Sequence, residues 1–457
     1  MDKLKKIIEF GFYLFLFLLP WQTRLIWHET YLNGFVWEYG RFSLYGTEIL
    51  LWLILLLYGF WLIKNRHLPK FEFDKILIRL TKPAVSIYWL LVLFLGLAGV
   101  SIIWSLDAQL AYIRWFTLLE AMALLSLVLV FGFKLEKIAV VWVSSAAIQG
   151  IFAIWQFFTQ YVFANKWLGL AEHFSTLGGA IILQTNSERW LRAYGSLPHP
   201  NILAGFLVVG ILLLLYLALI AKKQGQRIFV LVSLIAIMPA LFFSFSRSGW
   251  VALIFSLTIL TFWLVYHRYY LWRNTFFKIL LLTLIIYSVL GSSLWQPLLT
   301  RISGEQDLEV ASIYLRVAFT KQAWEIIKTN PWQGTGIGDY TLGVYQIVNS
   351  SWPGYYYQPV HNIYLLVLAE LGILGALLFI LILGLLFWNL IKTKIVIDQS
   401  PQHLEKVIVF LCLISVLIIS LFDHYFWTFY FGVMIFWLIL GLNLRQLNFR
   451  NKDLNTS

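Results

Sequence analysis

Apolar runs of about 20 residues recur from one end of this 457-residue chain to the other. A helix of about 20 residues is long enough to cross the roughly 30 Å hydrocarbon core of a membrane. Only 12% of the residues are charged, whereas soluble globular chains average about 25%. The pattern predicts an all-α polytopic integral membrane protein, with residues 1–457 as a single membrane domain.

About twelve segments fit a membrane-spanning helix by length and apolar content. They are expected at residues 7–21, 48–63, 84–104, 114–133, 138–163, 201–221, 228–246, 249–266, 279–296, 361–391, 407–422 and 428–444. The first run ends in Leu-Leu-Pro-Trp, without the small-residue cleavage site of a signal peptide. It is therefore predicted to be a retained helix.

The basic residues predict which side of the membrane each loop faces. With the amino terminus in the cytoplasm, the cytoplasmic segments hold most of the 34 lysines and arginines, as the positive-inside rule requires. The net charge of +12 is then a topology signal, so no nucleic-acid partner is expected. Both termini are predicted to be cytoplasmic, and the helix that begins at His361 is predicted to start on the outer side.

The single cysteine, Cys412, gives no disulfide framework and is expected to be a small buried hydrophobe.

The polar sequence is concentrated in three predicted outer loops. These are a loop at 22–47, a smaller loop at 164–200 and a large loop at 297–360. Loops longer than about 15 residues are usually functional or disordered. Because these loops are rich in Trp and Tyr, we expect them to be ordered and functional.

Two segments of the large loop have recognisable patterns. The segment VASIYLRVAFTKQAWEIIKTNP predicts an amphipathic helix along the membrane surface that stops at Asn330-Pro331. One face of that helix is expected to carry Ile313, Val317, Trp324 and Ile327. The segment QGTGIGDY lacks a preceding strand and the spacing of a nucleotide loop. A tight turn or a backbone-lined anion nest is the better interpretation.

Four outward-facing stretches carry side chains that suit chemistry: LRAYGSLPHPN, FFSFSRSGW, IYLRVAF and PVHNIYL. The candidate residues in them are Arg192, His199, Asn201, Arg247, Tyr314, Arg316, His361 and Asn362. Arginines at an outer interface suit a lipid-linked phosphate or diphosphate, because the guanidinium fork matches phosphate oxygens and stays charged. A neutral imidazole can accept the proton of an attacking hydroxyl near neutral pH. Because positive charge stabilises a phosphoryl-linked leaving group, the combination predicts a transferase.

Each candidate also has a structural interpretation. An interfacial arginine often only extends its charge to lipid headgroups, although the turn that holds Arg247 leaves that side chain little water to reach. A histidine at a helix start, such as His361, is often a cap or a packing residue. Tyrosines and tryptophans such as Trp352 form an aromatic belt in one interpretation and stack on sugars in the other.

The acidic residues divide in the same way. Glu305, Asp307 and Glu309 form either a metal site or, as we expect, a solvated acidic run. Glu120 and Glu370 lie within predicted spans, where a carboxylate is costly and must be bonded internally or functional. We expect a structural role for Glu120, and the role of Glu370 stays open.

In their order and spacing these motifs resemble the O-antigen ligase and polymerase family. The resemblance rests on Arg192 through Asn201, the SFSRSG turn, the LR…W…NPWQGTGIGDY segment and HNIYLLVLAELGILG, and it covers residues 164 to about 378. It implies a metal-independent glycosyltransferase without a cofactor. Such an enzyme takes a glycan from undecaprenyl diphosphate and places it on an acceptor at the outer face of the bacterial cytoplasmic membrane.

The resemblance also implies roles for single residues. His361 resembles the essential loop histidine of the family, the proposed general base, whereas Arg247 and Arg316 resemble two essential arginines that engage the donor diphosphate. Arg192 matches a basic position before the sixth span. The other candidates are expected to bind substrate, namely His199, Asn201, Tyr314 and Asn362.

The acceptor stays open between three classes. Ligases transfer to lipid A-core, which is the first expectation; polymerases transfer to another lipid-linked glycan, and related oligosaccharyltransferases to a protein Ser or Thr. Membrane lipids are the remaining expected partners. A transporter or flippase would instead carry ionisable residues along its spans and matching broken helices in two halves. Because the spans hold few charges, that alternative is disfavoured, as is a purely structural assembly protein.

Overall fold

A computed structural model describes residues 2–64, 83–392 and 401–448, and these residues are predominantly helical. Within that part of the chain, eleven helices are long and apolar enough to cross a membrane. They are α2 (Gly46–Lys64), α4 (Pro83–Val100), α5 (Ala108–Phe131), α6 (Leu135–Thr159), α7 (Pro200–Ile220), α8 (Gln224–Phe243), α9 (Arg247–Tyr266), α10 (Tyr270–Ser293), α14 (Ile363–Lys392), α15 (Pro401–Ile419) and α17 (Tyr430–Asn448). Helix α1 (Asp2–Leu18), with 17 residues, takes the place of the first predicted span. The predicted all-α polytopic membrane fold is confirmed, with boundaries shifted by up to nine residues.

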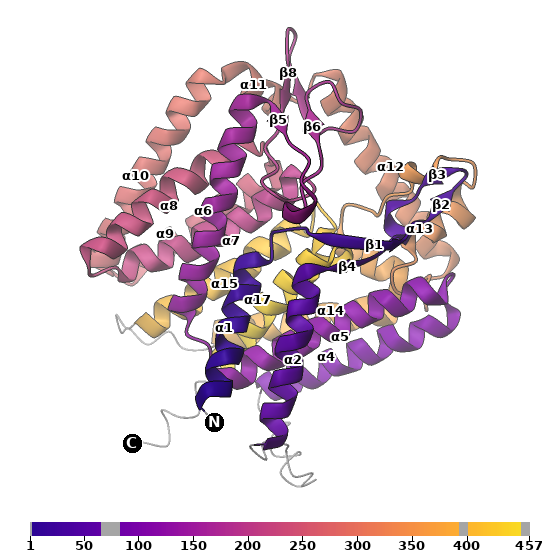
Figure 1. The fold of residues 1–457 in the computed structure, drawn as a ribbon, viewed down its shortest axis with the longest axis horizontal. Coiled ribbons are helices and arrows are strands. Elements are labelled where there is room, and N and C mark those ends of the chain that lie inside the picture. Colours follow the sequence, from indigo (N-terminus) through magenta and orange to yellow (C-terminus); the bar gives the residue numbers. More distant parts are fainter. Residues whose placement is uncertain (1, 65–82, 393–400, 449–457) are drawn as a thin grey trace.

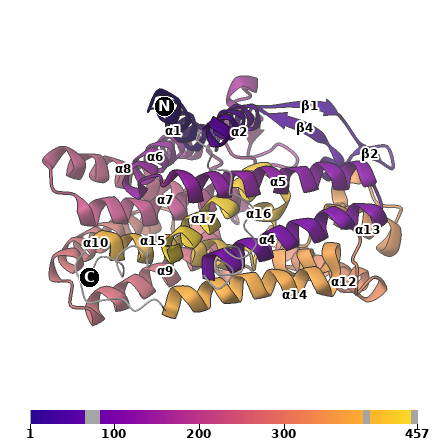
Figure 2. The same cartoon turned by 90° about the horizontal axis from the view of Figure 1, so that it is seen from below.

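Helices α7 and α17 form the centre of the bundle. The most apolar stretch of each is completely buried, as expected for a helix that is hydrophobic on all sides. Helix α5 packs on α17, α15 packs on α7, and α6 packs on both α7 and α8. Figure 2 shows α4, α5 and α14 running side by side along one flank. Helices α2 and α10 are mostly exposed, which places them at the lipid-facing periphery.

The two shorter outer loops fold into small antiparallel hairpins, which the sequence patterns did not predict. The first contains β1 (Arg24–His28), β2 (Tyr31–Leu32), β3 (Phe35–Val36) and β4 (Phe42–Tyr45), paired as β1–β4 and β2–β3. The second contains β5 (Tyr161–Val162), β6 (His173–Phe174), β7 (Ile182–Gln184) and β8 (Arg189–Leu191), paired as β5–β6 and β7–β8. Strands this short show no readable alternation. In Figure 1, β5, β6 and β8 lie at the top of the view, and β1, β2, β3 and β4 lie lower and to the right.

The large loop is mainly helical and contains α11 (Trp295–Ser303), α12 (Asp307–Thr329) and α13 (Tyr340–Gly343). Helix α12 ends at the predicted stop and begins three residues before the predicted segment. Ile313, Val317 and Trp324 are exposed, as a surface-lying apolar face requires. Ile327 is buried, so the protein covers this face near the end of the helix. Helix α12 packs against α14.

The glycine-rich segment is a turn that packs against a kink in α14. Gly372 interrupts that helix with a φ of 64°, and a Cβ there would lie 2.1 Å from the Trp332 carbonyl oxygen. The backbone N–H of Thr335 donates to the Ala369 carbonyl at 3.0 Å, and that of Gly336 donates to the Glu370 carbonyl at 2.9 Å. The predicted tight turn is observed, and its backbone N–H of Gly338 also donates to the Glu370 carboxylate.

Candidate active site

A cavity of about 710 Å³ lies between the β1–β4 hairpin, the second outer loop, and the chain segments that precede α14 and α16 (Tyr425–Thr428). Two of the predicted residues, His199 and His361, line it. Asp423 and His424 also line it, and sequence reasoning missed both. The available signal was their position, because they begin the short polar turn between the last two apolar runs.

His361 lies directly before α14 and is held between two rings. It stacks on Phe319 of α12 with ring centroids 5.5 Å apart, and it meets His424 edge-on at 5.0 Å. Its buried Nδ1 has no well-aligned hydrogen bond within the described residues, although the Pro359 carbonyl is near the ring. Burial lowers the pKa of His361 below its ordinary value of 6.5; Asp423 opposes this shift and Arg316 adds to it. The ring is therefore neutral near pH 7 and able to accept a proton.

Asp423 is a buried carboxylate surrounded by imidazoles. Its Oδ1 accepts the backbone N–H of His424 at 2.9 Å, and its Oδ2 accepts the Asn201 side-chain amide at 3.1 Å. Burial alone would raise the pKa of Asp423, but His361, His424 and His199 together bring it below the ordinary 3.8. An ionised carboxylate in this place can stabilise a positive charge that develops on His361.

The other two histidines are structural in their contacts. His199 caps α7, because its Nδ1 accepts the Asn201 backbone N–H at 3.0 Å. The Nδ1 of His424 lies 2.8 Å from the Thr428 hydroxyl. Burial lowers the pKa of each ring to about 3, so both are neutral at physiological pH. They shape the cavity wall around His361 and Asp423.

The predicted basic residue before the sixth span is also inside the protein. Arg192 is only 4% exposed, and it donates from Nη2 to the Asn201 Oδ1 at 2.7 Å and from Nε to the Ser244 carbonyl at 2.7 Å. Asn201 in turn reaches Asp423. These contacts connect Arg192 through Asn201 to the Asp423 carboxylate, so Arg192 has a positioning role.

Arg247 is the first residue of α9 and leaves 37% of its side chain exposed. Its Nη2 donates to Oε2 of Glu309 on α12. The Nη1 of Arg301, a second residue that sequence reasoning missed, is 2.6 Å from both oxygens of the same carboxylate. Glu309 is thus a buried partner of two arginines, and the expectation of a solvated acidic run was wrong for this residue. In the described ranges no group of three or more His, Cys, Asp or Glu residues is arranged to hold a metal ion.

Helix α12 connects the residues around His361 with the cluster of Arg247, Glu309 and Arg301. Glu309, Arg316 and Phe319 are spaced seven and three residues apart, which places them on one face of the helix over about 15 Å. Glu309 holds Arg247, and Phe319 stacks on His361. Within the described chain the guanidinium of Arg316 has no hydrogen bond or ion pair, but its charge lowers the pKa of both His361 and His199. Of the three residues expected to be catalytic, Arg316 therefore lies on this face of α12, and Arg247 and His361 contact the same face.

Two predicted substrate-binding residues have other positions. Asn362 caps α14: its side chain accepts the Leu365 backbone N–H at 3.0 Å and donates to the Leu421 carbonyl at 3.2 Å. Tyr314 is 72% exposed. Its position two residues before Arg316 turns it to the opposite face of α12. The structure does not bring Tyr314 to the cavity.

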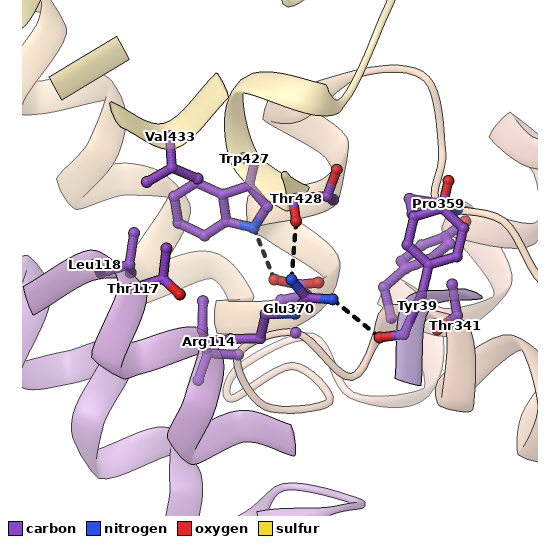
Figure 3. A pocket seen from close by; sticks show the side chains of 13 residues that line it. Tyr39, Arg114, Thr117, Leu118, Thr341, Pro359, Glu370, Trp427, Thr428 and Val433 are labelled. Atoms are coloured by element: carbon purple, nitrogen blue, oxygen red, sulfur yellow. Dashed lines mark hydrogen bonds between the residues drawn. The ribbon is translucent and has the colours of Figure 1, made fainter. Parts of the chain in front are cut away.

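A smaller cavity of about 30 Å³ lies beside the first and is drawn in Figure 3. Arg114 of α5 donates to the carbonyls of Thr428 and Tyr39, both at 2.9 Å. Glu370 of α14 accepts the Trp427 indole N–H at 2.8 Å and the backbone N–H of Gly338 in the glycine-rich turn. The remaining intramembrane carboxylate, Glu120, accepts the Trp52 indole N–H at 2.7 Å.

Comparison with known proteins matches the same part of the chain. The family model described as O-Antigen ligase matches residues 232–380, a range that includes Arg247, Arg316 and His361. The general O-oligosaccharyltransferase of Acinetobacter baylyi is 27% identical over 249 residues, which are 52% of this chain and 41% of that protein. The chain thus spans about two fifths of the length of that relative. These matches support the O-antigen ligase family, as the sequence motifs had indicated.

Proposed function

We propose that this chain, a multi-pass membrane protein of the O-antigen ligase family, transfers a glycan from undecaprenyl diphosphate to an acceptor hydroxyl at the outer face of the cytoplasmic membrane. The observation that carries the proposal is the single face of α12 that joins Arg247, Arg316 and His361. An imidazole that can accept a proton stands at one end of this face. Guanidinium groups that can bind phosphate oxygens stand at its middle and its other end.

The reaction follows from these positions. The neutral His361 ring accepts the proton of the acceptor hydroxyl while its oxygen bonds to the anomeric carbon of the donor glycan. The bond between that carbon and the diphosphate oxygen breaks, and its electron pair stays on the diphosphate. Arg316 and Arg247 stabilise the negative charge that develops there. Asp423 stabilises the imidazolium formed on His361.

A lipid-linked donor is supported by the outer face of the same helices. Ile302 of α11 and Leu308, Ile313 and Val317 of α12 are all exposed apolar side chains. They lie on the outside of elements whose inner side carries the arginine–carboxylate cluster. A polyprenyl chain can therefore remain in lipid against these residues while its diphosphate reaches Arg247 and Arg316.

The cavity beside His361 is where we place the acceptor. Its volume of about 710 Å³ is in the range of pockets that hold small ligands or several sugar units. Lipid A-core is our first acceptor. The relative named as a general O-oligosaccharyltransferase makes a protein hydroxyl the second candidate, and another lipid-linked glycan is the third.

The test is reconstitution of the purified chain in proteoliposomes with a glycan on undecaprenyl diphosphate, EDTA present and no added nucleotide. Lipid A-core, a lipid-linked repeat unit and a protein with acceptor serines are supplied in separate reactions. The masses of the products identify the acceptor. Absence of transfer to all three acceptors from a donor that demonstrably binds would refute the proposal.

A further inference from the structure

The turn that presents Arg247 is held by two buried arginines. Arg192 donates from Nε to the carbonyl of Ser244, and Arg301 donates from Nε to the carbonyl of Phe245, each at 2.7 Å. Between them, Phe245 has a φ of 45°, in the left-handed region that a bulky residue rarely adopts. The backbone conformation before Arg247 is thus held by one side chain from the loop at 164–200 and one from the loop at 297–360. Unusual backbone conformations held in this way are common where a functional residue is positioned.

The two arginine partners of Glu309 make different numbers of contacts with its carboxylate oxygens. Arg301 lies 2.6 Å from both of its oxygens, and both residues are almost fully buried. Arg247 reaches only Oε2, and its side chain is 37% exposed. The Arg301–Glu309 pair is therefore complete without Arg247, whereas Arg247 uses only part of its five-donor guanidinium on the carboxylate.

The region carries an excess of positive charge. Arg192, Arg247, Arg301 and Arg316 act on one another through space, and Glu309 is the carboxylate among them. Burial, together with the charge of Arg301, lowers the pKa of Arg192, and Glu309 opposes this shift. The cluster is therefore built to receive additional negative charge near Arg247 and Arg316, where the side chains are partly exposed.

We propose that Glu309 is a positioning residue that holds the Arg247 guanidinium in the unliganded protein and yields it to a diphosphate oxygen when the donor binds. This inference rests on the function proposed above. The exchange leaves no buried carboxylate unpaired, because Glu309 keeps Arg301, so the large cost of an isolated buried charge does not arise. A phosphate can offer the Arg247 fork two oxygens for parallel hydrogen bonds, whereas Arg247 reaches only one oxygen of Glu309, whose two oxygens both contact Arg301.

The experiment measures binding of farnesyl diphosphate to the purified full chain in detergent by calorimetry. Glu309→Gln keeps the shape of the side chain but removes the charge that competes for Arg247. We expect affinity to increase about fivefold and turnover with the full donor to fall, because Arg247 is no longer held in position. The matched control is Glu305→Gln, since Glu305 is an exposed acidic residue four positions earlier. It should leave both quantities unchanged.

A double-mutant cycle identifies Arg247 as the route of the effect. In an Arg247→Ala background the affinity gain from Glu309→Gln should disappear, because the residue that changes partners is absent. Unchanged or weaker binding in Glu309→Gln, or an equal gain in the Arg247→Ala background, would overturn the inference. If Glu309→Gln does not fold, Glu309→Asp, with its carboxylate withdrawn by one methylene, must show the tighter binding. If wild type binds no farnesyl diphosphate, the proposed function itself fails.

Discussion

Two places in this protein are built from the same residue types and differ in how many of their hydrogen-bonding groups are already paired. In the smaller cavity, Arg114 donates to two backbone carbonyls, and Glu370 accepts an indole N–H and a backbone N–H. In the cluster along α12, Arg247 is partly exposed, and Arg316 has no hydrogen-bond partner in the described part of the chain. An arginine inside a membrane protein is therefore not functional by location alone. What marks a candidate site is hydrogen-bonding capacity that the protein itself does not use.

The volumes of the two cavities agree with this difference. The cavity near Arg114 holds about 30 Å³, whereas the one beside His361 holds about 710 Å³. The glycine-rich turn closes the first, because a Cβ on Gly338 would lie 2.3 Å from Cγ of Arg114. We therefore interpret Arg114 and Glu370 as a connection between α5, α14 and the outer loops, and His361 with the α12 arginines as the reactive region.

Replacing His361 should have the largest effect on this comparison. His361→Ala removes the proposed general base and should reduce turnover about 10²–10⁴-fold. Folding should be preserved, because the ring packs at the cavity wall. The measurement is glycan transfer in proteoliposomes, with His28→Ala as the control, since His28 is an exposed outer-loop histidine. Wild-type turnover in His361→Ala would contradict the assignment of His361 as the general base and of this cavity as the reactive region.

Arg316→Ala should reduce turnover about 10²–10³-fold, as expected when one group that stabilises developing charge is lost. Because Arg316 has no hydrogen bond or ion pair within the described residues, the melting temperature should change little. Arg316→Lys should recover only part of the activity, since a point charge lacks the two-donor fork. A large loss of stability with normal activity per folded molecule would reverse the assignment. Arg189→Ala, at an exposed hairpin arginine, is the control.

Arg114→Gln should give the opposite result. Loss of its two hydrogen bonds to Thr428 and Tyr39 should lower the free energy of unfolding by about 3 kcal/mol. Turnover per folded molecule should stay within about twofold of wild type. Denaturation in detergent, monitored together with glycan transfer, separates the two quantities. A stable but inactive Arg114→Gln protein would mean that the small cavity belongs to the active site.

The smallest expected effect is the pH dependence of the reaction. Burial lowers the pKa of His361 below 6.5, so the neutral, proton-accepting form persists to lower pH than in a free histidine. The transfer rate at pH 6.5 should therefore exceed half of its plateau value and fall only at lower pH. The charge of Arg316 contributes to this lowering, so Arg316→Ala should raise the pKa of His361. The acid limb of the residual activity should therefore shift to higher pH. A midpoint at or above 6.5 in wild type would contradict the assignment of the base.

Local patterns identified the membrane-spanning segments and part of the candidate site. Whether a run of apolar residues is long enough to span a membrane does not depend on what it packs against. Helices such as α7 and α14 could therefore be predicted with small errors at their ends. The motifs around Arg247, Arg316 and His361 were equally visible. The strands of the outer loops were missed because segments of two to five residues have too little periodicity to read.

The sequence alone therefore determined that the chain is a polytopic helical membrane protein, and its motifs marked several arginines and a histidine as candidate site residues. The tertiary structure decided which side chains meet. Asp423, which follows α15, lines the same cavity as His361, which precedes α14, and Glu309 of α12 joins Arg247 of α9 to Arg301 of α11. The sequence had marked neither acid as a site residue, because which groups share a buried space depends on how distant elements pack. For the same reason, only the tertiary structure showed that Ile327 of α12 is buried whereas Tyr314 is exposed.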